Sequence, residues 1–323
     1  MAYGGQEQPV IDINSKGQSR SLNRTVKMKS LYPWILFVLS LPALIVACSA
    51  NDAPALYVGG IPDQNVAFLE ERFDGLADYL SDELDLDVQY IPTTSYAAVV
   101  TGFSNGDIHL GWYGGLTGVQ ARLATPGAQA IAQRPRDAEF HSVFVANPAL
   151  GLKGLGGVAG MTLTFGSESS TSGHLMPRSF LSEAGVVPER DLDGPPSYSG
   201  SHDKTWKLVE AGAFQVGALN AAVWESAVDE GKVDLSAVDV FWLTPPYVDY
   251  HFVVRGDVDE TFGDGTTERL RAALLSIDVD DSNAGERERR IAESFQTERF
   301  IETTNENYQA IEDVAVELGI IKN

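Results

Sequence analysis

GSESSTSGHLMP, at residues 166–177, separates an apolar run from a segment with helical spacing. The apolar run, Met161 to Phe165, predicts a buried strand, and the apolar positions from His174 to Ala184 predict a helix. A buried strand that turns directly into a helix is the repeating unit of α/β proteins. We therefore expect a largely parallel sheet covered by helices.

Hydroxyl residues fill this turn, from Ser169 to Ser172, and Gly173 closes it. Hydroxyl groups, a glycine that permits close approach and free N–H groups at a helix start together suit a small anion. Serine and threonine also cap helices routinely without binding any ligand. The spacing alone leaves both interpretations open, an anion site and a plain helix cap.

The same alternation of strands and helices extends in both directions from this turn. Strands are predicted at residues 56–62, 87–92, 108–113, 140–146, 161–165, 215–219, 238–243 and 251–255. Helices are predicted at residues 66–84, 96–103, 116–123, 174–184, 204–210, 224–230, 268–276 and 307–318. This rhythm predicts an α/β fold and not a solenoid of repeats.

Two segments that contain proline divide the series into two lobes. Asn147-Pro148 is the predicted crossing into the second lobe, and Thr244-Pro245-Pro246 is the predicted return. We expect residues 56–147 and 250–323 to form lobe 1, and residues 148–249 to form lobe 2. Two α/β lobes joined by two crossings describe a hinged protein, whose ligand lies in the cleft at the carboxyl ends of the strands.

The chain is strongly acidic, with 45 Asp and Glu residues against 23 Lys and Arg residues and a formal net charge of −22. Such a surface repels nucleic acid and anionic membranes, which excludes nucleic-acid binding. It also repels anions at long range, so an anion site must work through local hydrogen bonds. Acidic residues spread along the whole chain suggest adaptation to high salt, where screening makes their repulsion tolerable.

Cys48 is the single cysteine, so no disulfide can form within the chain. The charged start Met28-Lys29 and the uncharged apolar segment from Leu31 to Ala47 precede it, as in a secretory signal. Ile45-Val46-Ala47-Cys48 resembles a bacterial lipobox, which implies cleavage and diacylation of Cys48. The alternative is an uncleaved membrane anchor.

From this pattern we expect residues 1–47 to be a signal peptide, whose translation starts at either Met1 or Met28. Residues 48–55 would be a tether that carries the lipid on Cys48. The remaining chain would be exported and held at the extracytoplasmic face of the membrane, since two acyl chains suffice for stable anchoring.

Polar side chains follow the predicted strand ends in both lobes, where a ligand of such a fold would bind. Each has an ordinary alternative: Tyr96 suits a half-buried aromatic position, His202 a helix cap, and Asp249 a solvated loop. Their shared place at strand ends favours a common site. The candidate residues are Tyr96, Tyr113, Ser170, Thr171, Ser172, His202 and Asp249.

These motifs resemble a known family. Ser170-Thr171-Ser172-Gly173, with Pro177, is similar to the Ser-Thr-Ser-Gly signature of periplasmic phosphonate- and phosphite-binding proteins of ABC importers. The resemblance extends from about Leu56 to the C-terminus and includes SYAAV at 95–99, WYG at 112–114, GSHD at 200–203 and TPPYVDY at 244–250. Residues 173–177 and 218–225 resemble the branch of this family that is often named for selenate.

The resemblance implies a type II periplasmic-binding-protein fold with no catalytic activity and no cofactor. It also implies that the seven candidate residues contact a small oxyanion, and that a partner permease with its ATPase subunit imports the ligand. We expect the binding protein to be a monomer. Family members that hold an aminoalkyl group carry a carboxylate where this chain has Ala222, so a smaller oxyanion is expected.

The chemistry of two candidate residues narrows the expected ligand. Ionised Asp249 can only accept hydrogen bonds, which favours an anion that keeps a proton, such as phosphite, phosphonate or phosphate, over selenate or sulfate. His202, if protonated, would donate from both ring nitrogens.

Two other classes of protein fit the sequence less well. A hydrolase needs one activated serine, but there is no Gly-x-Ser-x-Gly elbow, and residues 166–170 lack its final glycine. A metal carrier needs clustered ligands, whereas the five histidines are scattered along the chain. The chain has no Walker loop, so ATP hydrolysis would belong to a partner subunit.

Overall fold

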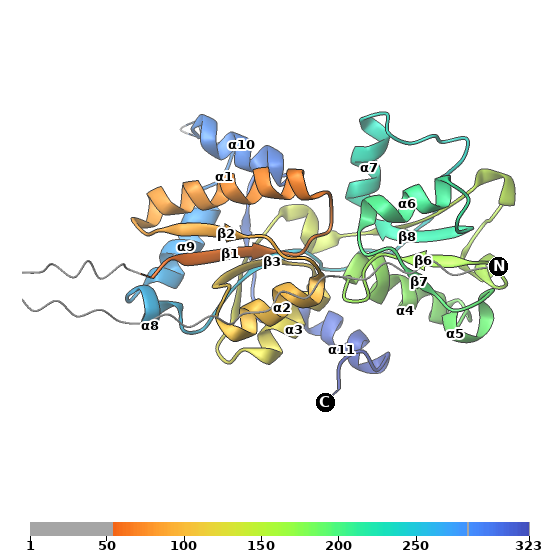
Figure 1. Cartoon of the computed structure of the whole chain (residues 1–323), viewed down its shortest axis with the longest axis horizontal. Coiled ribbons are helices and arrows are strands. Elements are labelled where there is room, and N and C mark those ends of the chain that lie inside the picture. Colours follow the sequence, from red (N-terminus) through yellow and green to blue (C-terminus); the bar gives the residue numbers. More distant parts are fainter. Residues whose placement is uncertain (1–53, 283, 323) are drawn as a thin grey trace, which may run out of the picture. The chain divides into compact units, whose positions relative to one another are not determined.

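The strands of the computed structural model, which describes residues 54–282 and 284–322, form two sheets (Figure 1). The six-stranded sheet has the order β11-β4-β10-β3-β1-β2, and the five-stranded sheet has the order β7-β6-β8-β5-β9. Helices interleave with the strands of both sheets. The predicted two-lobed α/β fold is thereby confirmed; we call the six-stranded sheet with its helices lobe 1 and the five-stranded sheet with its helices lobe 2.

Lobe 1 is built from both ends of the described chain. Its strands are β1 (Leu56–Gly60), β2 (Val88–Ile91), β3 (Leu110–Tyr113), β4 (Gln129–Gln133), β10 (His251–Val254) and β11 (Ile301–Glu302). Its helices are α1 (Val66–Leu84), α2 (Tyr96–Asn105), α3 (Gly115–Ala124), α8 (Val258–Phe262), α9 (Thr266–Leu275), α10 (Glu286–Ser294) and α11 (Gln309–Glu317), with the 3₁₀ turns η1 (Pro135–Glu139) and η5 (Asn305–Tyr308).

Lobe 2 is built from the middle of the chain. Its strands are β5 (Ser142–Ala146), β6 (Leu163–Phe165), β7 (Ser197–Tyr198), β8 (Val216–Asn220) and β9 (Asp239–Leu243). Its helices are α4 (Met176–Glu183), α5 (Pro188–Asp191), α6 (His202–Glu210) and α7 (Ala221–Asp229), with 3₁₀ turns η2 (Pro148–Leu150) and η3 (Leu155–Val158) and one π-helical turn, η4 (Thr171–Leu175).

Parallel strands place the starts of several helices at one edge of the lobe 1 sheet. β1 pairs in parallel with both β2 and β3, so their carboxyl ends point the same way. The α1 side chains Leu69, Phe73, Leu76 and Leu80 are buried at helical spacing, which fixes that helix on the sheet. Tyr96 follows β2 at the first position of α2, and Gly115 follows β3 at the first position of α3.

The first crossing between the lobes differs from the predicted one. β5 pairs antiparallel with β8 and β9, so residues 142–146 belong to the lobe 2 sheet and not to lobe 1. The chain therefore crosses before β5, where Phe140 forms an antiparallel bridge with Tyr247 of the return segment. A buried apolar run predicts a strand, but only its hydrogen-bonded partners decide which sheet it joins.

The remaining differences concern local elements. The helix expected from His174 begins with the π-helical turn η4, which closes with a hydrogen bond from the N–H of Leu175 to the carbonyl of Ser170. The strands β4, β7 and β11 and the helices α5, α8 and α10 were not among the predicted elements. The return to lobe 1 through β10 agrees with the prediction.

In the part of the chain that the structure describes, no helix has the length and apolar content to cross a membrane. The predicted signal peptide at residues 1–47, Cys48 and most of the predicted tether lie outside the described residues.

Candidate functional site

The hydroxyl loop, residues 166–173, connects β6 to the π-helical turn. The Ser170 hydroxyl accepts a hydrogen bond from the N–H of Gly173 at 2.9 Å and caps the turn. A backbone hydrogen bond of 2.8 Å from Gly166 to Gly173 closes the loop. An added Cβ at Gly173 would lie 3.0 Å from the Cα of Gly166, so the closure needs glycine there. The predicted helix cap is thereby confirmed. Three of the five hydroxyl side chains of the loop, those of Ser170, Thr171 and Ser172, are buried, as the anion-site interpretation would also require.

Thr171 links this loop directly to lobe 1. Its hydroxyl accepts a 2.9 Å hydrogen bond from the N–H of Leu116, in the first turn of α3. An added Cβ at Gly114, which precedes α3, would lie 3.0 Å from Asp249 Oδ1 and 3.1 Å from Thr171 Oγ1. Glycine thus lets the start of α3, the hydroxyl loop and Asp249 come together.

Asp249 is fully buried beside the same helix start. Its Oδ1 accepts a 2.8 Å hydrogen bond from the N–H of Gly115, whereas its Oδ2 has no hydrogen-bond partner among the described residues. Burial raises the pKa of Asp249 to about 7, although the Gly115 N–H and the nearby Thr171 and Ser172 hydroxyls oppose the shift. Near neutral pH this group is therefore partly protonated, whereas the acceptor role derived from the sequence requires the carboxylate form.

Two buried hydroxyls accompany Asp249. Tyr96 Oη and Ser172 Oγ are buried and have no hydrogen-bond partner among the described residues. Burial raises the pKa of Tyr96 well above its ordinary value, and the charges of Asp63 and Asp249 raise it further. Tyr96 is therefore a neutral hydrogen-bond donor. Buried polar atoms without partners are uncommon in proteins. The charge of Asp249 acts on Tyr96, and the Ser172 side chain acts on Asp249, so one polar ligand placed among them would satisfy all three atoms.

His202 enters the site from the start of α6. Its Nδ1 lies 3.3 Å from the N–H of Asn220, which makes Nδ1 the acceptor and leaves the hydrogen on Nε2. Burial lowers the pKa of His202 to about 4. The protonated ring that donation from both nitrogens requires is therefore not the form expected near neutral pH, and the neutral ring donates from Nε2 alone.

A hydrogen-bond network joins His202 to lobe 1. Its Nε2 lies 3.4 Å from the Tyr250 hydroxyl, which donates to Asp63 Oδ2 at 2.9 Å and accepts from Asn220 Nδ2 at 3.1 Å. The carbonyl of Asp63 accepts a further hydrogen bond from the N–H of His202 at 3.1 Å. Asp63 Oδ1 is buried without a hydrogen-bond partner among the described residues.

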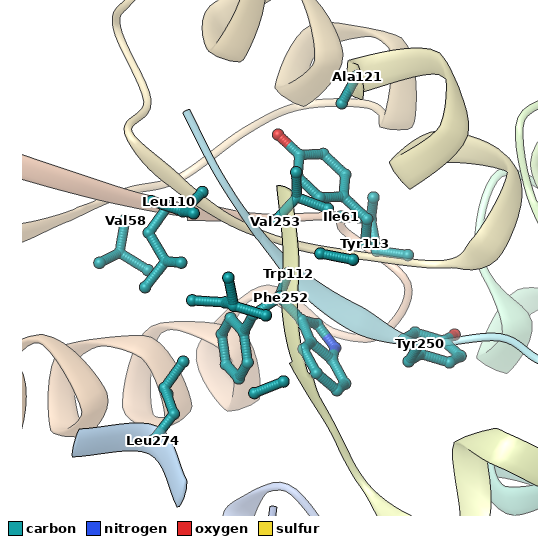
Figure 2. Packing of buried hydrophobic residues seen from close by; sticks show 14 of the residues in the cluster. Val58, Ile61, Leu110, Trp112, Tyr113, Ala121, Tyr250, Phe252, Val253 and Leu274 are labelled. Carbon is teal, nitrogen blue, oxygen red and sulfur yellow. The ribbon is translucent and has the colours of Figure 1, made fainter. Parts of the chain in front are cut away.

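Tyr113 does not join this group. Its ring lies over β3, since an added Cβ at Gly111 would be 2.5 Å from the Tyr113 hydroxyl. The ring also packs edge-on against Phe103, with 5.7 Å between the ring centroids. Figure 2 shows the hydroxyl directed away from Tyr250. The structure therefore brings together six of the predicted residues, Tyr96, Ser170, Thr171, Ser172, His202 and Asp249, and leaves Tyr113 apart.

Sequence reasoning missed three members of the site network: Asp63, Asn220 and Tyr250. Asp63 follows the carboxyl end of β1, and Asn220 ends β8, so both obey the strand-end rule that selected the other candidates. Asn220 also caps α7 by accepting from the N–H of Val223, which is a recognisable helix-start signal.

The assembled groups suit a small anion that carries a hydrogen. Two hydroxyls without partners among the described residues, Tyr96 Oη from lobe 1 and Ser172 Oγ from lobe 2, accompany one free carboxyl oxygen, Asp249 Oδ2. In the described residues no three His, Cys, Asp or Glu side chains gather in the way that metal ligands would. The donor set therefore points to hydrogen bonding as the means of recognition.

Comparisons with known proteins identify the family to which the chain is similar. Residues 58–308 match the family described as the phosphonate ABC transporter periplasmic substrate-binding protein. The chain is 44% identical over 278 residues to a probable ABC transporter phosphite-binding protein, PhnD1, of Prochlorococcus marinus (strain MIT 9301), covering 84% of this chain and 92% of that protein. A phosphate-import protein, PhnD, of Mycolicibacterium smegmatis is 26% identical over 220 residues, covering 62% and 68%.

Among solved structures, PhnD1 of Prochlorococcus marinus in complex with methylphosphonate superposes with a TM-score of 0.79 and covers 83% of this chain and 99% of that one. A binding protein of a phosphonate ABC transporter from Pseudomonas aeruginosa is 18% identical, covers 82% and 87%, and has a TM-score of 0.71. At this identity, the similarity to the Pseudomonas aeruginosa protein shows a shared fold and nothing further.

Proposed function

The chain belongs to the family of periplasmic substrate-binding proteins of phosphonate ABC transporters, and we propose that it binds a small phosphorus oxyanion, phosphite or a simple phosphonate, for import. Family membership makes it an extracytoplasmic binding protein and not an enzyme. The 44% identity to a probable phosphite-binding protein, whose structure holds methylphosphonate, supports this ligand class.

The single observation that carries the proposal is the free, buried Oδ2 of Asp249 among hydroxyl donors. A phosphite or phosphonate monoanion has one O–H group that can donate to this oxygen, while its other oxygens accept from the Tyr96 and Ser172 hydroxyls. Sulfate and selenate have no such hydrogen near neutral pH. They would bind only when Asp249 itself is protonated.

The complex would thus hold one proton between Asp249 and the anion, which gives each ligand class its own pH profile. For sulfate or selenate, affinity is constant below about pH 7 and falls about tenfold per pH unit above it, because binding then takes up a proton. A phosphorus anion with a pKa near 6 is protonated below that pH, as Asp249 is. Because the complex holds only one of these two protons, the other must be released, and affinity also falls at acid pH. The affinity for a phosphorus anion is therefore expected to be highest between the pKa of the anion, near 6, and that of Asp249, about 7.

Calorimetry of the purified protein with phosphite, methylphosphonate, phosphate, selenate and sulfate tests the proposal. We expect the phosphorus anions to bind more tightly than selenate and sulfate at pH 8, and their affinity to pass through a maximum with pH. Selenate that binds at least as tightly as phosphite would overturn the ranking. Failure of every phosphorus anion to bind would reject the function itself.

We further propose that the protein is anchored by lipid on Cys48 and delivers its ligand to a permease with an ATPase subunit. The lipobox-like residues 45–48 and the apolar segment before them support the anchor. In cells, the wild-type protein should partition with membranes and Cys48→Ala should not gain lipid. Equal labelling of both forms by a fatty-acid probe would contradict the anchor.

A further inference from the structure

His174 lies directly behind the hydroxyl loop and has no place in the ligand site. It is the fourth residue of the π-helical turn and is buried. Its Nδ1 lies 2.6 Å from the backbone carbonyl of Glu168, in the middle of the loop. Because a carbonyl oxygen can only accept, Nδ1 must carry the hydrogen.

The contacts of the second ring nitrogen, Nε2, agree with this tautomer. Nε2 accepts a 2.9 Å hydrogen bond from Nε of Arg178, one turn further along the helix, and lies 3.3 Å from the Tyr198 hydroxyl. Arg178 is fixed in turn by an ion pair of 2.7 Å with Glu189. The ring also packs edge-on against Phe165, the last residue of β6, at 4.9 Å.

We propose that His174 is a positioning residue for the anion site: its Nδ1–H holds the Glu168 carbonyl, and this fixes the hydroxyl loop. The ends of the loop are held by the bond between Gly166 and Gly173, and its second half by the bonds of Thr171 to Leu116 and of Ser172 to Ser142. Within the loop, short bonds run from Ser170 to Ser167 and from Gly173 to the Ser170 hydroxyl. These bonds shape the loop internally, whereas the His174 bond ties its middle to the helix that follows. Burial, with the positive charge of Arg178, lowers the pKa of His174 to about 4, so the neutral Nδ1–H form persists at neutral pH.

Two substitutions separate the loop bond from the Arg178 bond. The amide nitrogen of asparagine occupies nearly the place of Nδ1, so His174→Asn retains a donor to Glu168. The longer side chain of glutamine reaches the place of Nε2, so His174→Gln retains a partner for Arg178 and loses the loop bond. His109→Gln is the matched control, because His109 is half-buried, accepts from the Tyr57 N–H at 2.9 Å and precedes β3 at the end opposite the site.

Hydrogen exchange of residues 166–173 in the full chain without ligand tests the positioning directly. We expect about tenfold faster exchange of the Ser170 and Gly173 amides in His174→Gln, near wild-type exchange in His174→Asn, and no change in His109→Gln. Equal exchange in the two His174 variants would overturn the proposal. If the variants do not fold, ¹⁵N shifts of the wild-type ring decide it, since an Nε2-protonated neutral ring would contradict the assigned tautomer.

The consequence for affinity rests on the proposed function. Methylphosphonate should bind about tenfold more weakly to His174→Gln than to His174→Asn, with His109→Gln unchanged. Wild-type protein that binds no phosphorus anion would reject the function while leaving the exchange result intact. Equal methylphosphonate affinity in both His174 variants would show that the loop bond does not position the site.

Discussion

The hydroxyl of Thr171 lies 2.9 Å from the backbone nitrogen of Leu116, and this hydrogen bond joins the loop of lobe 2 to the first turn of α3 in lobe 1. The oxygen accepts from the N–H, so the hydroxyl hydrogen remains free to donate. One side chain thus joins the two lobes and keeps a hydroxyl hydrogen beside Asp249.

Replacing Thr171 by valine keeps the shape of the side chain and removes its hydroxyl. We expect Thr171→Val to weaken methylphosphonate binding by about 1–3 kcal/mol, since the variant loses a hydroxyl donor beside Asp249. The Leu116 N–H, left buried without its partner, should in addition lower stability. Calorimetry gives the measurement. The control is Thr101→Val on the exposed face of α2, whose hydroxyl bonds only to its own helix; equal loss in both variants would argue against a role for Thr171.

The Ser172 hydroxyl should contribute to anion binding but not to the stability of the free protein. Its hydroxyl is buried without a hydrogen-bond partner among the described residues, so Ser172→Ala should not destabilise the free protein but should weaken anion binding by about 1–3 kcal/mol. Ser142→Ala is the contrast, because that hydroxyl donates to the Ser172 carbonyl at 2.7 Å and its loss should lower stability. Urea unfolding and calorimetry together test the pair. Unchanged affinity in Ser172→Ala would remove this hydroxyl from the site.

The two tyrosines that the sequence places in one site should respond differently to the same change. Tyr96→Phe removes a hydroxyl that lies among the site groups, and we expect anion affinity to fall about tenfold or more. Tyr113→Phe removes a hydroxyl that faces Phe103 and Gly111, so affinity should stay at the wild-type value. A loss of affinity in Tyr113→Phe would mean that the lobes rearrange on binding.

Asp249 should make stability depend on pH. Its pKa in the folded protein, about 7, lies above the value near 3.9 of an unfolded aspartate, so the folded protein binds this proton more tightly. Its contribution to stability is therefore complete below about pH 4 and is lost as the pH rises through about 7. The free energy of unfolding of Asp249→Asn, relative to wild type, should rise from pH 5 to pH 8.

Urea unfolding at both pH values gives this comparison. The control is Asp74→Asn, which removes one carboxyl group from the exposed side of α1. A difference between Asp249→Asn and wild type that stays constant with pH would contradict the shifted pKa.

The net charge of −22 predicts that salt stabilises the protein. Screening of repulsion between acidic groups should raise the melting temperature as KCl increases from about 0.01 M to about 1 M, with most of the gain at low concentration, where the screening length changes most. Thermal unfolding followed at several KCl concentrations measures this. A melting temperature that does not change with salt would rule out adaptation of this surface to high salt.

Local patterns in the sequence predicted much of the fold. The spacing of Leu69, Phe73, Leu76 and Leu80 marks α1 because a helix buries one stripe of residues, and the alternation with apolar runs marks the α/β class. The strand-end rule selected Tyr96, His202 and Asp249 without any knowledge of their contacts. These signals depend on residues within a few positions of one another, so the sequence contains them completely.

Contacts between distant residues decided the rest. Pairing with β8 and β9 placed β5 in lobe 2. The Tyr113 ring packs over Gly111, so its hydroxyl points away from the site. Burial, which no single segment defines, set the pKa of Asp249 and the neutral form of His202.

The hydroxyl loop shows both kinds of information, local sequence signals and contacts between distant residues. Its sequence determined that a capped helix start rich in hydroxyls would follow a buried strand. Only the tertiary structure decided that this start meets Asp249 and α3, because Leu116 and Thr171 are 55 positions apart and Asp63 and Tyr250 are 187 apart. A binding site between two lobes is a property of such distant pairs, and the periodicity of a sequence does not record them.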